Sequence, residues 1–272
     1  EAVSRGRKVK QGDCKNAFCQ PELPEDEVVI VKPPKGCPFT PTGKYWKLNK
    51  TLYGLCRSPR HWYDKITGAL IELGFTRCEH DPCLWRTHPS DDTPPVFVGL
   101  YVDDFGYFST TAEQEKWFET EMQKRFTVEF MGPMSYFLGC RYDWIDHEDG
   151  SLSVHISQEG FLEAVLDKFG LEHSREAATP FRSGLPIDRI PHLENMKLAD
   201  RLALRKTMQS ILGCLTWLSI GTRPDISVPT SLLSQFQNEP SPGHLDGAKH
   251  VLRYLSGTST YGISYHQNAS LA

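Results

Sequence analysis

The chain has 272 residues, of which 39% are hydrophobic, 11% aromatic and 24% charged, a composition that excludes wholesale disorder and is typical of a folded globular protein. Its formal net charge of −4 excludes a global positive field that would attract nucleic acid, so any nucleic-acid site must be local. No run approaches the roughly 18 apolar residues of a membrane-spanning helix, and no signal peptide opens the chain, so the sequence predicts a soluble intracellular protein.

Local positive charge gathers near the start of the chain. Two clusters stand out, the first being Arg5, Arg7, Lys8 and Lys10 and the second Lys44, Lys47, Lys50, Arg57 and Arg60. Each is either a solvated face or a nucleic-acid contact, and composition does not choose between them.

The eight cysteines lack the paired spacing of zinc sites. The nearest approach to a metal-binding box is Cys78, His80 and Cys83, which has no second Cys/His pair downstream. All eight are therefore predicted to be reduced thiols.

The first 50 residues are rich in Pro, Gly and charge, and they contain strand-like runs at 8–14 and 28–32. A helix follows. Ser58 is the expected N-cap, Pro59 suits the first helical position, and apolar residues recur at helical spacing until Gly74 ends the pattern.

Two further strands are predicted at 83–87 and 96–108, and the second is a hairpin with Asp103 and Asp104 at its tip. Thr110 and Glu113 have the spacing of a capping box, which predicts a helix from there to about residue 125.

A second hairpin is predicted over 137–156, with its turn at 147–150. Beyond it, a helix with one apolar stripe ends at Gly170. A Pro-containing linker at 179–192 is the expected domain boundary. Three helical segments follow, at 198–219, 224–236 and 243–255; Pro229 should kink or break the second of them.

The tip of the first hairpin carries unusual turn chemistry, because tight hairpins prefer Asn-Gly or Asp-Gly to adjacent aspartates. Two carboxylates about 4 Å apart repel by roughly 4 kcal/mol at an effective dielectric constant near 20. A hard divalent cation such as Mg²⁺ relieves that repulsion and takes oxygen ligands. The alternative is a solvated Asp-Asp loop.

The residues around this tip resemble a known family. Tyr101-Val102-Asp103-Asp104 resembles the YxDD box of reverse transcriptases, and residues 13–18 (DCKNAF) resemble the D-x-K-x-A-F box of copia-type enzymes. Residues 52–62 (LYGLCRSPRHW) resemble another segment of that family. Further landmarks follow in the family's order, at 132–133, 136–139, 157–158, 168–170, 179–180, 213, 222–226, 233–234, 248–249, 252–255 and 257–258.

The chain thus resembles the reverse transcriptase of copia-type (Pseudoviridae) LTR retrotransposons, a part of the Pol polyprotein. This resemblance implies an α+β fold: a right-hand polymerase palm, built as an antiparallel sheet with helices on one face, followed by a helical thumb and connection region. The expected domains are palm with a remnant of the fingers at 1–158, thumb start and linker at 159–192, and thumb/connection at 193–272. Most of the fingers would precede residue 1, and the ribonuclease H domain would follow residue 272.

The resemblance also implies the catalytic residues. Asp13, Asp103 and Asp104 would hold two Mg²⁺ ions, or Mn²⁺, with the Cys14 carbonyl as a further oxygen ligand. One ion would lower the pKa of the primer 3′-hydroxyl and the other would bind the triphosphate and the leaving pyrophosphate.

Phe18 would exclude ribonucleotides at the sugar 2′ position, and Tyr53 and Gly54 would contact the incoming nucleotide. A core phenylalanine and a buried strand-to-helix junction are the structural alternatives. Phe137, Leu138 and Gly139 would form the primer grip, although an ordinary hydrophobic hairpin explains the same pattern. Arg223-Pro224-Asp225 is expected to hold helix packing.

The implied function is RNA-directed DNA polymerase. Its partners would be an RNA template, a DNA or RNA primer, deoxynucleoside triphosphates and other Pol and Gag segments, without a membrane. Its place would be a cytoplasmic virus-like particle whose product is destined for the nucleus. The alternatives are a decayed or domesticated inactive copy that binds nucleic acid, and a metal-dependent nuclease. Two departures from the family pattern bear on this choice: Cys19-Gln20-Pro21, and Gly12 in place of an apolar residue.

Overall fold

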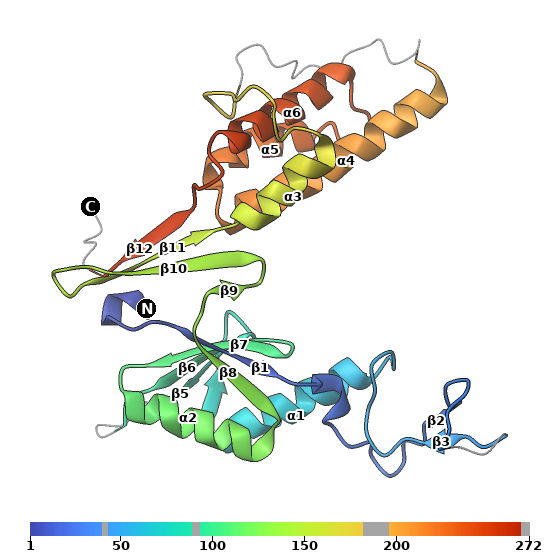
Figure 1. Ribbon diagram of the computed structural model, residues 1–272, viewed down its shortest axis with the longest axis vertical. Helices are drawn as coiled ribbons and strands as arrows, with labels where there is room; N and C mark the ends of the chain where they lie inside the picture. Colours follow the sequence, from blue (N-terminus) through green and yellow to red (C-terminus); the bar gives the residue numbers. More distant parts are fainter. Residues whose placement is uncertain (40–42, 89–92, 182–195, 268–272) are drawn as a thin grey trace. The chain divides into compact units, whose positions relative to one another are not determined.

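The computed structural model describes residues 1–39, 43–88, 93–181 and 196–267, and the chain divides into two compact units, Glu1–Met134 and Ser135–Ala272 (Figure 1). The first unit is a six-stranded antiparallel sheet in the order β4-β5-β6-β7-β1-β8. The strands are β1 (Lys10–Cys14), β4 (Phe75–Arg77), β5 (Leu84–Thr87), β6 (Val96–Tyr101), β7 (Asp104–Ser109) and β8 (Val128–Pro133).

Helices α1 (Ser58–Glu72) and α2 (Ala112–Arg125) pack against this sheet and share one hydrophobic core with it (Figure 1). In β6 every second residue is buried, as a strand with one face on the core requires. The core members include Trp62, Ile66, Leu70, Val96, Val98, Phe105, Tyr107, Phe118 and Met122. The α+β class and the acidic hairpin are confirmed.

Shorter elements complete the first unit. Two 3-10 turns, η1 (Val3–Arg5) and η2 (Ala17–Cys19), flank β1, and strands β2 (Ile30–Val31) and β3 (Trp46–Lys47) pair with each other. The sequence did not predict β4 or β8. Gly132 and Pro133 at the end of β8 favour a turn in isolation, and pairing with β1 makes them a strand.

Both predicted N-caps are wrong by one residue. Ser58 is already helical, and its hydroxyl donates to the Leu52 carbonyl at 2.7 Å instead of capping α1. Thr111, not Thr110, caps α2 and accepts from the Gln114 amide at 3.4 Å. In the helix that begins after Thr111, the buried Glu115 carboxylate forms ion pairs with Arg7 at 2.7 Å and with Lys10 at 3.0 Å. These ion pairs join residues that are far apart in the sequence, so the local capping pattern does not include them.

Gly12 is explained by its neighbour across the sheet. It pairs with Phe105, whose fully buried ring lies where a side chain at Gly12 would stand. A Cβ added at Gly12 would overlap that ring. The large residue on β7 therefore fills the space left by the small residue on β1.

Replacing Gly12 by Val is accordingly expected to lower the free energy of unfolding by about 1–3 kcal/mol, the usual effect of overpacking. Phe105→Leu should rescue part of this loss in the double variant, because the two residues compete for one volume. Urea unfolding of the two single variants and the double variant measures the coupling. Additive effects would contradict the packing explanation.

In its described residues the second unit combines a four-stranded antiparallel sheet, in the order β12-β11-β10-β9, with four α-helices. The strands are β9 (Tyr136–Phe137), β10 (Cys140–Asp146), β11 (Leu152–Ser157) and β12 (Ile263–His266). The helices are α3 (Glu159–Phe169), α4 (Leu198–Gly221), α5 (Ser227–Ser234) and α6 (Pro242–Ser256). The second hairpin and all four helices were predicted, whereas β12 was not.

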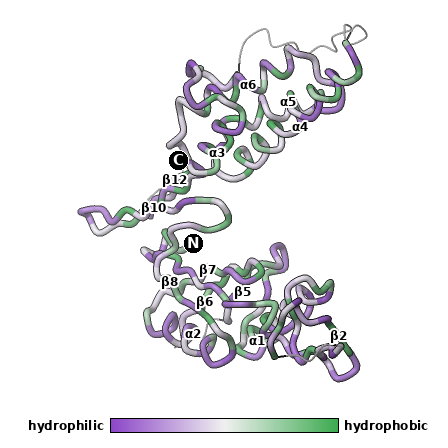
Figure 2. Tube along the Cα trace, turned by 45° about the vertical axis from the view of Figure 1, so that its right-hand side comes forward, coloured by the Kyte–Doolittle hydropathy of each residue, from purple (hydrophilic) through white to green (hydrophobic). Residues whose placement is uncertain are grey.

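The four helices of this unit share one core, to which α3 contributes Leu162 and Val165 and α6 contributes Val251 and Leu252. Figure 2 shows apolar and polar residues interleaved along these helices. Helices on both sides of the expected linker boundary thus belong to one unit, and the chain divides between Met134 and Ser135 instead. Of the linker itself, 182–192 lies outside the described residues.

Pro229 does not break a helix. It lies in the first turn of α5, where its missing N–H has no intrahelical partner to lose. The interruption comes earlier, at the separate 3-10 turn η4 (Pro224–Ile226). None of the helices described is long and apolar enough to cross a membrane.

Candidate active site

The acidic hairpin and β1 meet in the sheet of the first unit. Tyr101 and Asp104 pair across β6 and β7, which leaves Val102 and Asp103 as a two-residue turn. On the other side of β7, Asp13 pairs directly with Asp104. Directly opposed residues of an antiparallel pair place their side chains on the same face, about 5 Å apart at Cβ. Two strands far apart in the sequence therefore bring Asp13 beside the hairpin tip.

The turn is also fastened to β1 through the main chain. The Cys14 amide donates to the Asp103 carbonyl at 2.9 Å. The Cys14 side chain itself is buried in the hydrophobic core. The expectation for Cys14 concerned its carbonyl oxygen and stays a prediction.

Negative charge at this tip is only partly compensated. Burial raises the pKa of Asp104, and the charges of Asp103 and Asp13 raise it further, while Lys15 opposes them. Burial and the same three carboxylates raise the pKa of the Cys14 thiol to about 12. Mutual repulsion of this kind is what a bound cation would relieve.

Lys15 supplies the compensation that is present. Its ammonium group bridges the Asp13 carboxylate at 2.9 Å and the Glu129 carboxylate at 2.5 Å. Glu129 lies on β8 directly opposite Asp13. The two carboxylates raise the pKa of Lys15, so this side chain stays charged. Lys15 belongs to the DCKNAF box at residues 13–18, but no sequence pattern indicated its ion pairs or marked Glu129.

The donor set of the tip consists of carboxylate oxygens, which suits Mg²⁺ or Mn²⁺. Within the described ranges, however, no three His, Cys, Asp or Glu side chains already converge as a metal site. Asp13 is engaged by Lys15 instead. The candidate ligands are Asp13, Asp103 and Asp104.

The predicted nucleotide-binding residues lie beside this tip. The rings of Phe18 and Tyr53 contact each other with centroids 5.1 Å apart, although 35 residues separate them in the chain. Tyr53 is 51% exposed. Burial raises the pKa of its hydroxyl, as do the nearby charges of Asp103 and Asp13. Gly54 has a φ of +92°, a conformation that glycine adopts without strain.

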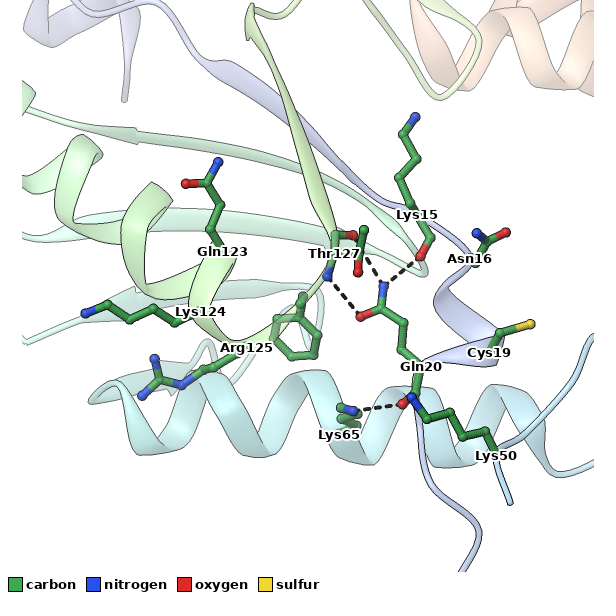
Figure 3. Close-up of a pocket in the computed structure, with 11 residues that line it drawn as sticks. Lys15, Asn16, Cys19, Gln20, Lys50, Lys65, Gln123, Lys124, Arg125 and Thr127 are labelled. Carbon is green, nitrogen blue, oxygen red and sulfur yellow. Dashed lines mark hydrogen bonds between the residues drawn. The ribbon is translucent and has the colours of Figure 1, made fainter. Parts of the chain in front are cut away.

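A basic hollow of about 530 Å³ is lined in part by the segment that follows Asp13 (Figure 3). Its cationic side chains come from five separate positions: Lys15, Lys50, Lys65, Lys124 and Arg125. Only Lys50 belonged to a cluster visible in the sequence, because the others converge only in the folded chain.

Two residues of the departure at Cys19-Gln20-Pro21, Cys19 and Gln20, line this hollow. The Gln20 side chain donates to the Lys15 carbonyl at 2.7 Å and accepts from the Thr127 amide at 3.2 Å (Figure 3). The Gln20 carbonyl in turn accepts from Lys65 at 2.9 Å. Gln20 thus links the segment after Asp13 to α1 and to the start of β8. The residue that departs from the family pattern therefore has a structural role in this chain.

The predicted primer-grip residues belong to the second unit. Leu138 and Gly139 form the two-residue turn between β9 and β10, with φ of +50° and +79°. Positive φ at both positions is the geometry of a type I′ hairpin turn. Phe137 ends β9, and the Trp217 ring of α4 packs near Gly139. No residue of this turn is assigned a role by its local geometry alone.

The chain is similar to a reverse transcriptase family and to transposon proteins of plants and yeast. The family model described as reverse transcriptase (RNA-dependent DNA polymerase) matches residues 1–183. The chain is 30% identical over 271 residues to the retrovirus-related Pol polyprotein from transposon RE1 of Arabidopsis thaliana, covering 100% of the chain and 17% of that protein. It is 29% identical over 261 residues to the corresponding polyprotein from transposon TNT 1-94 of Nicotiana tabacum, covering 95% and 19%.

A yeast protein is similar over most of its own length. The transposon Ty5-1 protein YCL074W of Saccharomyces cerevisiae is 29% identical over 250 residues, which cover 91% of this chain and 76% of that protein. By contrast, the chain spans less than a fifth of the two plant polyproteins. No solved structure matches the chain.

Proposed function

Because the chain belongs to the copia-type LTR retrotransposon reverse transcriptases, we propose that it is the palm and thumb part of an RNA-directed DNA polymerase. The proposed reaction joins a deoxynucleotide to the 3′-hydroxyl of a primer on an RNA template. The observation that carries the proposal is the pairing of Asp13 with Asp104 beside the Asp103 turn.

The proposed catalytic residues are Asp13, Asp103 and Asp104, with the Cys14 carbonyl as a further oxygen ligand. Two divalent cations, Mg²⁺ or Mn²⁺, would when bound lower the pKa of the primer hydroxyl and neutralise the triphosphate. Because the Lys15 ammonium group is bonded to Asp13, Asp13 would have to exchange this partner for a cation before all three carboxylates could hold the metal ions together. Glu129 can then retain the ammonium group.

The basic hollow is the proposed approach of the triphosphate. Its lining includes Lys15, two positions after Asp13, and its basic residues supply local positive charge that the chain as a whole lacks. Phe18 and Tyr53 would contact the nucleotide there, and Gly54 would allow the bend of the chain beside them.

Phe18→Ala is expected to increase the use of ribonucleotides relative to deoxyribonucleotides by roughly 10- to 100-fold, the range that one pocket side chain commonly contributes. The reason is that removing the ring from its contact with Tyr53 leaves space for a 2′-hydroxyl. Primer extension with each nucleotide set gives the ratio of kcat/KM values. An unchanged ratio would make Phe18 an ordinary packing residue.

For the functional domains, we propose that the palm, with a remnant of the fingers, extends beyond the first compact unit to residue 158, that 159–192 is the thumb start and linker, and that 193–272 forms the thumb and connection region. Phe137, Leu138 and Gly139 would position the primer end. The proposed partners are an RNA template, a primer, deoxynucleoside triphosphates and other Pol and Gag segments. The proposed location is a cytoplasmic virus-like particle.

Primer extension on an RNA template with Mg²⁺ tests the function, using a chain that includes the flanking Pol segments. Template-dependent DNA synthesis supports the polymerase. Binding of RNA without synthesis would instead support a domesticated, inactive copy. Degradation of nucleic acid without added nucleotides would favour a nuclease.

A further inference from the structure

The turn that carries Asp103 accepts a second hydrogen bond from outside the hairpin, donated by a tryptophan of helix α1. The indole Nε1–H of Trp62 donates to the Val102 carbonyl at 2.7 Å. Trp62 is only 1% exposed, and its ring meets Phe126 edge-on with centroids 5.5 Å apart. A fully buried side chain of one helix thus reaches the main chain at the tip of a distant hairpin.

Val102 needs such an anchor because its backbone is strained. Its φ is +56°, a region that β-branched residues rarely adopt. Such a conformation persists only where its surroundings fix it. Here the Val102 carbonyl is held by Trp62 and the next carbonyl, that of Asp103, is held by the Cys14 amide. The two hydrogen bonds thus fix consecutive peptide groups of the turn.

We propose that Trp62 is a positioning residue for catalysis, whose indole N–H fixes the strained turn from which the Asp103 carboxylate projects. The catalytic effect of this hydrogen bond rests on the proposed polymerase function. The hydrogen bond itself, from Trp62 to the Val102 carbonyl (the Trp62 clamp), is a property of the folded chain. Without the N–H, the Val102 carbonyl loses its partner and the turn relaxes toward conformations that valine prefers. The carboxylate of Asp103 then leaves its place beside Asp13 and Asp104.

The chain offers a matched control in Trp85. It lies on β5 in the same hydrophobic core and is 5% exposed. Its indole nitrogen has no hydrogen-bond partner among the described residues. Trp85→Phe therefore removes the same part of a buried ring as Trp62→Phe, but it takes no donor from the turn.

The first measurement is amide hydrogen exchange of the full chain, followed by mass spectrometry of peptides that cover the turn. Trp62→Phe is expected to speed exchange at residues 102–104 by about fivefold to tenfold relative to Trp85→Phe, the effect of one net hydrogen bond. Equal exchange in the two variants would overturn the proposal. If Trp62→Phe does not fold, benzothienylalanine at position 62 keeps the ring's shape and removes only the donor.

The second measurement is Mn²⁺ affinity, by titration calorimetry. A loss of about fivefold to tenfold in Trp62→Phe, with Trp85→Phe close to wild type, supports the positioning role; equal affinities in the two variants count against it. A wild-type chain that binds Mn²⁺ no better than Asp103→Asn would count against the proposed function itself, and the exchange measurement would still decide the Trp62 clamp.

Discussion

Replacing Asp103 by Asn is expected to reduce primer extension by roughly three orders of magnitude, which corresponds to about 4 kcal/mol of transition-state stabilisation. The turn places Asp103 next to the Asp13–Asp104 pair, and an amide cannot supply the negative charge that the proposed metal site needs. The side chain keeps its size, so the loss should appear in kcat with little change in thermal stability. Single-turnover extension on an RNA template measures it.

Asp64→Asn is the control for this experiment. Asp64 lies on α1, is exposed, and pairs with Arg60 at 2.8 Å, so the same change of charge occurs away from the hairpin. Its extension rate should match that of the wild type. If wild type and Asp103→Asn extend primers equally, the polymerase assignment of this site is wrong. If neither extends them, the inactive-copy alternative gains support.

The second large effect concerns stability, in the ion pair between the buried Arg223 and the partly exposed Asp225 of the second unit. Asp225→Asn is expected to lower the free energy of unfolding by about 2–3 kcal/mol, because the buried Arg223 guanidinium loses its carboxylate partner while the 34% exposure of Asp225 lets solvent screen part of the loss. Arg223 is 2% exposed and donates twice to Asp225, at 2.8 and 3.1 Å. Its other donors reach the Thr258 carbonyl and hydroxyl, and Tyr254 donates to Asp225 at 2.8 Å. Denaturant unfolding measures the loss.

The same pair predicts a dependence on pH. Burial by itself raises the pKa of Asp225, but hydrogen bonds from Arg223 and Tyr254 outweigh it and leave this pKa below its usual value. The stabilisation is therefore complete above the unfolded-state pKa of about 4 and is lost as pH falls through the lower folded-state value. The difference between wild type and Asp225→Asn should be constant near neutral pH and shrink in acid.

An exposed ion pair provides the comparison. Arg60 and Asp64 are both exposed, so Asp64→Asn should change the free energy of unfolding by less than about 1 kcal/mol. If Asp225→Asn is no more destabilising than Asp64→Asn, the Arg223 network does not hold the helices together. The sequence interpretation of Arg223-Pro224-Asp225 as a packing motif would then fail.

Local patterns determined most of the elements by themselves. The acidic hairpin, the helix after Ser58 and the helices of the second unit follow from periodicity and from residues such as Gly170, whose φ of +64° ends α3. The same patterns misplaced both N-caps by one residue. Thr110 and Thr111 are equivalent locally, and Ser58 is a better capping residue by type than Arg57, which holds the cap position of α1. The positions of the caps are distinguished only by contacts in the folded chain: the hydrogen bond from Ser58 to the Leu52 carbonyl and the ion pairs of Glu115.

The sequence by itself determined the order of the motifs and the chemistry of the aspartates, since both depend on residues that are neighbours in the chain. The tertiary structure alone decided that Asp13 pairs with Asp104. It also decided that Lys15 bridges Asp13 and Glu129, and that Trp62 donates a hydrogen bond to the Val102 carbonyl. These contacts join residues distant in sequence, and their geometry depends on strand register and helix packing. No local pattern encodes that geometry, because it results from the burial of the core that the sheet of the first unit shares with α1 and α2.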